Sequence, residues 1–158
     1  MVRRTGGIAS RRANSGFTLI EMIVAVAILL ILTALAIPAV RVTIQRQREH
    51  DLRYALWQMR DSIDRYKDAA DRGGFQIKLG SEGYPPDLED MVKGVDVNGK
   101  KIRFLRRIPV DPMTGKTEWG LRSMQDDPQS DSWGGQNVFD VYTKSEGTAL
   151  DGSKYKEW

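Results

Sequence analysis

A long uncharged apolar segment near the amino terminus constrains this chain more than any other feature. The nineteen positions from Met22 to Val40 contain no charged residue, and the apolar stretch as a whole covers the 24 residues 17–40. As an α-helix, a segment of this length spans roughly 36 Å, whereas the hydrocarbon core of a bilayer is ~30 Å thick. The segment therefore predicts a membrane-spanning helix, with the more polar remainder of the chain folding outside the membrane.

The residues before this segment predict its orientation. They include four arginines and no acidic residue: Arg3, Arg4, Arg11 and Arg12. The positive-inside rule keeps such an end in the cytoplasm and sends the carboxyl-terminal part outward. A cleaved secretory signal peptide has a shorter apolar core of about 7–15 residues. Twin-arginine export is suggested only by the adjacent pair at positions 11 and 12. A single-pass membrane protein is the preferred interpretation.

The same arginines account for the basic charge of the chain. Its 24 lysines and arginines exceed its 21 aspartates and glutamates, giving a net charge of +3 and a pI near 9.2. Without the four leader arginines, 20 basic residues face 21 acidic ones. The rest of the chain therefore has no basic domain that would bind nucleic acid. The absence of cysteine and the presence of one histidine give no basis for thiol catalysis or a zinc site, and we expect no enzymatic activity.

Glu21 is the only charged residue within the apolar stretch. On insertion scales, an aspartate at the centre of a membrane helix costs on the order of 2.5–3.5 kcal/mol, and less near the edge. Two interpretations remain open. The carboxylate either lies close enough to the interface to reach water, or it has a cationic partner within the membrane.

The residues around Glu21 also carry a family resemblance. Gly16, followed by Phe17-Thr18-Leu19-Ile20-Glu21 and the apolar run, resembles the class III signal of type IV pilins and type II secretion pseudopilins. The resemblance implies that a prepilin peptidase cleaves after Gly16 and methylates the new amine of Phe17. It also implies that Pro38 is the helix-kinking proline of that family. The new amine would lie four residues from Glu21, where it could neutralise the carboxylate of its own or a neighbouring subunit; in the family, the accepted partner is the neighbour's amine. Glu21 and Pro38 are thus the candidate assembly residues.

Beyond the apolar segment, the chain predicts an amphipathic continuation of the same helix. Apolar residues recur at spacings of 4, 3, 4, 3 and 4, which place them on one helical face: Leu52, Leu56, Met59, Ile63, Tyr66 and Ala70. We expect one helix from about residue 17 to residue 70, ended by Gly73-Gly74. Its apolar face needs a cover, which only the following residues of the chain can provide.

Residues 73–158 predict a small antiparallel sheet with long loops, so the fold class is α+β. Asn98-Gly99 is typical of a hairpin turn between strands at 95–97 and 102–104, and Asp87 is a possible cap for a short helix. The segments 117–124 and 137–143 are the best remaining strand candidates. Together with the long helix, this arrangement is pilin-like.

The head resembles the G-type (major) pseudopilin in particular. The matching parts are Tyr84-Pro85, the Ile108–Pro112 loop, Trp133-Gly134 and the segment from Phe139 to Thr143. The resemblance implies a Ca²⁺ site in the loop 143–157, and Ca²⁺ requires six to eight oxygen ligands. The candidate ligands are Asp151, Asp140, Glu146 and Glu157. A solvated Asp-Gly turn without metal is the preferred alternative, because the loop has few acids and three lysines.

These observations predict four segments: a leader, 1–16; a membrane or filament-core helix, 17–40; its amphipathic continuation, 41–72; and a globular head, 73–158. The resemblance implies a structural subunit of a type II secretion pseudopilus, stored in the inner membrane with a cytoplasmic amino terminus and a periplasmic head. Its partners would be further copies of itself in a helical filament, prepilin peptidase, the inner-membrane assembly platform, other pseudopilins and the membrane. A type IV pilus subunit for adhesion or motility and a membrane-anchored binding module are the alternatives.

Overall fold

The structure is a computed structural model that describes residues 16–158, without the side chains of residues 35–39. The leader residues 1–15 lie outside the described part. The elements in chain order are α1 (Leu19–Asp71), α2 (Leu88–Lys93), β1 (Val95–Val97), β2 (Lys100–Ile102), β3 (Gly120–Arg122), β4 (Asp140–Tyr142) and the 3₁₀-helix η1 (Tyr155–Glu157). The chain forms two compact units, one ending at Val40 and the other comprising Arg41–Trp158.

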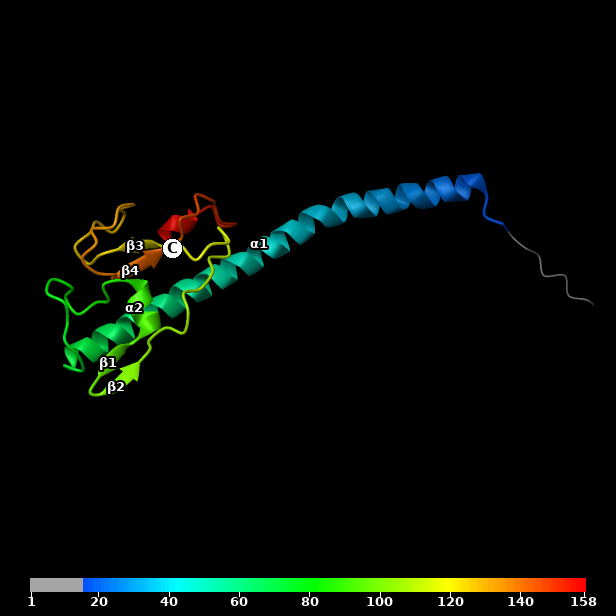
Figure 1. The fold of residues 1–158 in the computed structure, drawn as a ribbon. Coiled ribbons are helices and arrows are strands. Elements are labelled where there is room, and N and C mark those ends of the chain that lie inside the picture. Colours follow the sequence, from blue (N-terminus) through cyan, green and yellow to red (C-terminus); the bar gives the residue numbers. More distant parts are fainter. Residues whose placement is uncertain (1–15) are drawn as a thin grey trace, which may run out of the picture. The chain divides into compact units, whose positions relative to one another are not determined.

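The carboxyl-terminal part of α1 provides the surface on which the head is built. All six residues of the predicted apolar stripe, Leu52 to Ala70, are buried. The periodicity of 3.6 residues places them on one face, and the rest of the head covers that face (Figure 1). Two smaller residues, Ala55 and Ser62, are buried between them. The amphipathic stripe predicted from the sequence is confirmed.

Glycines end this helix as predicted. α1 ends at Asp71, and Gly73 then adopts a positive φ of 68°, a conformation that favours glycine. The amide of Gly73 donates to the carbonyl of Ala70 and that of Gly74 donates to the carbonyl of Ala69. These bonds satisfy carbonyl groups that the last turn of a helix would otherwise leave free.

The first hairpin has the predicted turn but a different second strand. β1 and β2 pair antiparallel, with Val97 opposite Lys100. The intervening Asn98 and Gly99 both have positive φ values, 53° and 82°, as a two-residue type I′ turn requires. The expected strand at 102–104 is therefore wrong by two residues: β2 covers Lys100–Ile102, because a two-residue turn requires pairing to resume immediately after Gly99.

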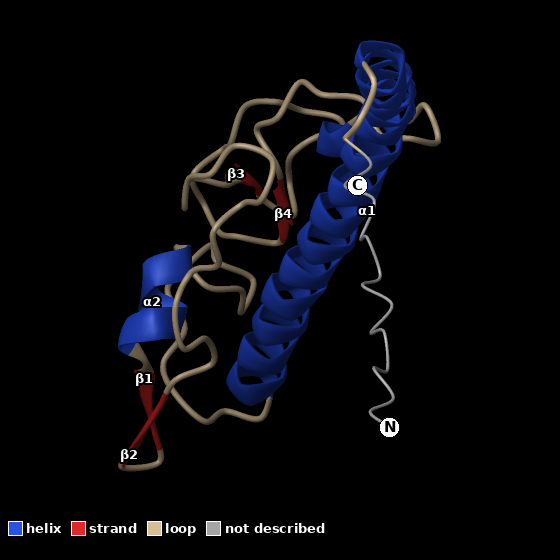
Figure 2. Ribbon diagram, turned by 90° about the vertical axis from the view of Figure 1, so that its right-hand side faces the viewer, coloured by secondary structure: helices blue, strands red, loops and turns tan. Residues whose placement is uncertain are grey.

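The other predicted head elements are present but short. The carboxylate of Asp87 accepts a hydrogen bond from the amide of Asp90 at 2.7 Å and caps α2. β3 and β4 pair antiparallel in the expected segments, with Leu121 opposite Val141, although each strand has only three residues. Figure 2 shows long connecting loops between these elements. The α+β fold predicted from the sequence, a long helix against a small antiparallel head, is confirmed.

A single hydrophobic cluster holds the head on α1. It combines the α1 stripe from Leu52 to Tyr66 with buried residues from α2, β4, η1 and the loops: Leu88, Met91, Leu105, Trp119, Val138, Val141, Ala149 and Tyr155. In the described part of the chain, the buried hydrophobic residues begin at Leu52. None of the apolar side chains described before Leu52 belongs to this core.

The structure does not confirm the expected membrane span over residues 17–40. A search of the described residues finds no helix with both the length and the apolar character needed to cross a bilayer. The membrane helix therefore stays a prediction.

Candidate functional site

The first candidate site is the start of α1, which carries the predicted processing and assembly residues. Thr18 precedes the helix, and its hydroxyl oxygen accepts a hydrogen bond from the amide of Glu21 at 3.2 Å. The carbonyl of Thr18 accepts from the amide of Met22. Thr18 is thus the N-cap, with a glutamate three residues later, which is the pattern of a capping box. The signal is visible in the sequence alone, although this cap was not among the predicted features.

Gly16 and Phe17 lie immediately before this cap in non-helical conformation. The side chain of Phe17 is exposed. A Cβ atom added at Gly16 would have no described atom within 4 Å, and no positive φ is recorded there. Among the described residues, nothing in the fold requires glycine at position 16, and its predicted role in cleavage stays a prediction.

Glu21 lies in the first turn of α1 and is exposed. Within residues 16–158, its carboxylate makes no hydrogen bond or ion pair. A negative charge in the first turn interacts favourably with the positive end of the helix dipole, but no described cation neutralises it. Pro38 falls within the bounds of α1, and its side chain is outside the described part, so its predicted role in a kink is untested.

The apolar side chains after Glu21 have no cover of their own. Exposed large hydrophobic residues occur on every side of the helix between Leu19 and Leu32, including Ile23, Val26, Leu29 and Leu30. An exposed apolar surface of this kind marks contact with another protein or with lipid. The start of α1 can therefore present one carboxylate at the end of an otherwise apolar rod.

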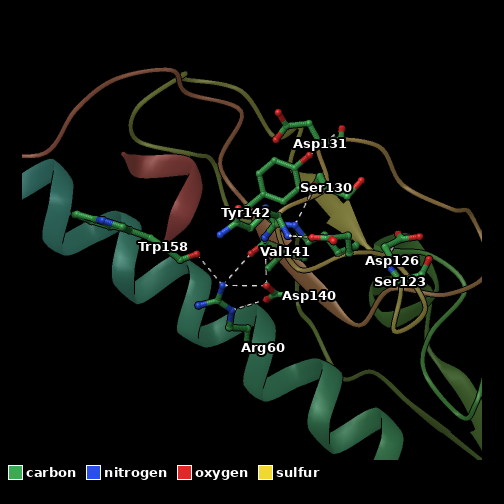
Figure 3. Close-up of polar contacts among 12 residues, drawn as sticks. Arg60, Ser123, Asp126, Ser130, Asp131, Asp140, Val141, Tyr142 and Trp158 are labelled. Atoms are coloured by element: carbon green, nitrogen blue, oxygen red, sulfur yellow. Dashed lines mark hydrogen bonds and ion pairs between the residues drawn. The ribbon is translucent and has the colours of Figure 1, made fainter. Parts of the chain in front are cut away.

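The second candidate site is a cluster of polar contacts that fastens the head to α1 (Figure 3). Arg60, on α1, donates from Nε to Oδ1 of Asp140 at 2.7 Å and from Nη2 to Oδ2 at 3.4 Å. The same Nη2 donates to the carbonyl oxygens of Val141 and Trp158, at 3.2 and 2.9 Å. One side chain thus joins α1 to β4 and to the residue after η1.

A second arginine holds the opposite side of the same carboxylate. Nη1 of Arg122 lies 3.7 Å from Oδ2 of Asp140, and only 11% of the Arg122 side chain is exposed. Its guanidinium stacks on the ring of Tyr142, 4.1 Å from the centroid, and its Nε donates to the carbonyl of Ser130. Asp140 therefore pairs with two arginines, one on α1 and one in the head.

Asp126 organises the loop beside this cluster. Its carboxylate accepts from the amides of Ser123 at 2.7 Å and Gly134 at 3.0 Å. These backbone hydrogen bonds, that of Gly134 first, hold the pKa of Asp126 below its usual value, because they stabilise the charged form. The two ends of the loop are thereby tied together.

The predicted Ca²⁺ ligands are dispersed among other contacts. Asp140 is bound by Arg60 and Arg122, and Glu146 lies 3.7 Å from Nζ of Lys156. Asp151 accepts from the hydroxyl and the amide of Ser153, which lower its pKa, and Glu157 belongs to η1. Throughout residues 16–158, no three acidic or histidine residues are grouped so that they could hold a metal ion. As placed, these residues do not fit the oxygen-rich shell that Ca²⁺ requires.

The comparisons with known proteins identify the amino-terminal region. Residues 11–37 match the family described as the prokaryotic N-terminal methylation motif. This match supports a type IV pilin-like family and includes Gly16, Phe17 and Glu21; it does not distinguish a G-type pseudopilin from its relatives. The searches of curated proteins and of solved structures found no match.

Proposed function

We propose that the chain is a structural, non-catalytic subunit of a type II secretion pseudopilus. The observation that carries the proposal is the methylation motif over residues 11–37, located where a helix begins at a threonine cap with a carboxylate in its first turn. Processing by prepilin peptidase after Gly16 would release the subunit from its leader. The subunit would then pass from the inner membrane into a periplasmic filament made of further copies.

The capped start of α1 suggests how cleavage prepares assembly. Cleavage after Gly16 leaves the amine of Phe17 next to the N-cap Thr18. A cation at this end of a helix is repelled by the positive end of the helix dipole. A carboxylate in the first turn interacts favourably with both the cation and the dipole. Glu21 is unpaired within residues 16–158, so it is available for an amine of its own chain or of a neighbouring subunit.

The exposed apolar side chains favour packing against other copies. A lipid environment and the core of a helical bundle can both cover residues 19–32, and assembly would exchange the first for the second. A carboxylate buried without its cation is heavily penalised. The Glu21–amine pair would therefore define which axial position of one helix can lie beside its neighbour.

A type IV pilus subunit is the second candidate, because the methylation motif is common to both kinds of filament. The two functions are separated by deletion of the gene in its host. Loss of protein export with surface pili retained supports the pseudopilus. Loss of adhesion or twitching with export retained supports the pilus.

The proposal is tested with Glu21→Gln and a matched control. Asp64→Asn removes an exposed carboxylate from the same helix, at a position far from its start. We expect both variants to be cleaved after Gly16 and methylated, as measured by intact mass, and only Glu21→Gln to lose filaments, as measured by chemical cross-linking of subunits into oligomers in intact cells. Normal filaments from Glu21→Gln would refute the pairing role. An uncleaved wild-type chain would refute the proposed function itself.

A further inference from the structure

The arginines of α1 fall into two groups that differ in their partners. Arg53, Arg60 and Arg65 each form an ion pair with an aspartate, at 3.6, 2.7 and 3.0 Å respectively. The three arginines that precede them in the helix are Arg41, Arg46 and Arg48. They are exposed, and none makes a hydrogen bond or an ion pair with any residue from 16 to 158. Such a group of uncompensated cations would attract an anion.

Two of these arginines line a groove between α1 and the head. The groove has a volume of about 330 Å³ and is lined by Arg41, Ile44, Gln45 and Arg48 of α1, with Met113 and Tyr155 opposite. The four α1 residues follow the spacing i, i+3, i+4 and i+7, which places them on one helical face. The groove thus combines two guanidinium groups with two apolar side chains.

The carboxylate of Glu49, next to this groove, is already occupied. Oε1 of Glu49 accepts hydrogen bonds from the hydroxyl of Tyr155 and the amide of Leu150, both at 2.9 Å. Gln45 donates to the same oxygen at 3.2 Å. These contacts hold Glu49 against the head. Since no acid within residues 16–158 pairs with Arg41 or Arg48, the two arginines are available to an anion from outside the subunit.

The position of the arginines in the chain indicates where that anion comes from. The uncharged run 22–40 directly precedes Arg41, and no acidic residue occurs between Glu21 and Glu49. Exposed apolar residues, Val42 and Ile44, alternate with the arginines. Clusters of cationic residues next to a membrane segment are attracted to anionic lipid headgroups. The positive-inside bias does not account for arginines on the outward side of such a segment.

We propose that Arg41 and Arg48 bind the phosphate of an anionic phospholipid headgroup at the outward face of the membrane. The planar guanidinium groups can each donate two hydrogen bonds to phosphate oxygens, and Ile44 and Met113 would contact the first apolar carbons of the acyl chains. Arg46 adds to the attraction from another face of the helix. The inference rests on the proposed storage of the subunit in a membrane. The headgroup would hold the base of the head at the surface until assembly.

The test measures lipid retention by the detergent-solubilised full chain in native mass spectrometry. The probes are dioleoyl phosphatidylglycerol, dioleoyl phosphatidylcholine and millimolar inorganic phosphate. We expect phosphatidylglycerol to be retained about 30-fold better than phosphatidylcholine, since each arginine near an anionic surface contributes about a fivefold factor. The double variant Arg41→Gln/Arg48→Gln should lose this preference. The matched control Arg106→Gln/Arg107→Gln removes two exposed head arginines and should keep it.

Several results would overturn the proposal. Equal retention of the two lipids, or an unchanged preference in the double variant, would exclude the headgroup site. Competition by inorganic phosphate at the affinity of the lipid would indicate a site for free phosphate. If the double variant kept its full lipid preference but assembled filaments poorly, the two arginines would instead bind acidic residues of a second copy of the chain. Lipid retention is measured on single subunits and does not depend on whether filaments form. The lipid site and the proposed function can therefore be refuted independently.

Discussion

Replacing Asp140 by asparagine should destabilise the head strongly although the side chain keeps its size. Asp140 accepts two hydrogen bonds from Arg60 and faces Arg122 at 3.7 Å. Hydrogen bonds to charged groups contribute about 1.5–3 kcal/mol, against about 1 for neutral pairs. Asparagine would also leave the mostly buried Arg122 without a carboxylate. Allowing for the 39% exposure of the Arg60 side chain, we expect the free energy of unfolding to fall by about 2 kcal/mol.

The companion variant Arg60→Gln should cost less, about 1 kcal/mol, because Asp140 keeps Arg122 as its cation. The double variant should show a coupling energy on the order of 1 kcal/mol, as expected for residues in direct contact. Urea unfolding followed by tryptophan fluorescence measures these values, with the buried Trp119 as the core probe. Glu89→Gln is the control, because Glu89 and Lys93 form an exposed helical pair that contributes less than about 0.5 kcal/mol. An Asp140→Asn effect no larger than that of Glu89→Gln would refute this account of the cluster.

Three further predictions concern processing, metal and pH. Gly16→Phe should block cleavage but leave the urea midpoint of the head unchanged, since position 16 contacts no described atom. Intact mass measures cleavage, and unfolding curves measure the midpoint. A mature amino terminus at Phe17 in this variant would contradict the prediction. Excess EDTA should leave the melting temperature unchanged, because cations of the chain already engage the predicted Ca²⁺ ligands Asp140 and Glu146; a clear fall in melting temperature would restore the calcium site. The loop tied by Asp126 should keep its order as the pH falls through the ordinary aspartate pKa of about 3.9 and lose it only at the lower folded-state pKa. The reason is that the stabilisation from a lowered pKa disappears as the carboxylate protonates. Hydrogen exchange at the amide of Gly134 measures this loss, with Asp126→Asn as the comparison.

Local patterns made much of the fold predictable. The α1 stripe could be identified because burial on one helical face imposes a period that is visible in the sequence. The Asn98-Gly99 turn and the Asp87 cap could be identified because each depends on the chemistry of one or two residues. The predicted bounds of the second hairpin strand were wrong because they followed the apolar residues. The length of the turn is the feature that fixes where pairing resumes.

The contacts of the second candidate site could not be predicted in the same way. Arg60 and Asp140 are 80 positions apart, and no periodicity links charges at that separation. Asp140 was predicted as a possible metal ligand, whereas the structure places two arginines around it. The unpaired state of Arg41 and Arg48 could also not be predicted, because it becomes visible only once the partners of the other arginines are known.

The composition of the head core has a consequence for how this chain can change over evolutionary time. In the described residues, the core begins at Leu52, so the exposed apolar residues of the stretch 22–34 meet no volume constraint from this core. Substitutions among Leu, Ile and Val in the stretch 22–34 should therefore leave head stability unchanged while altering how helices of different subunits fit together. Filament geometry and head surface could diversify independently, with Arg60 and the stripe as the positions where the helix remains tied to the head.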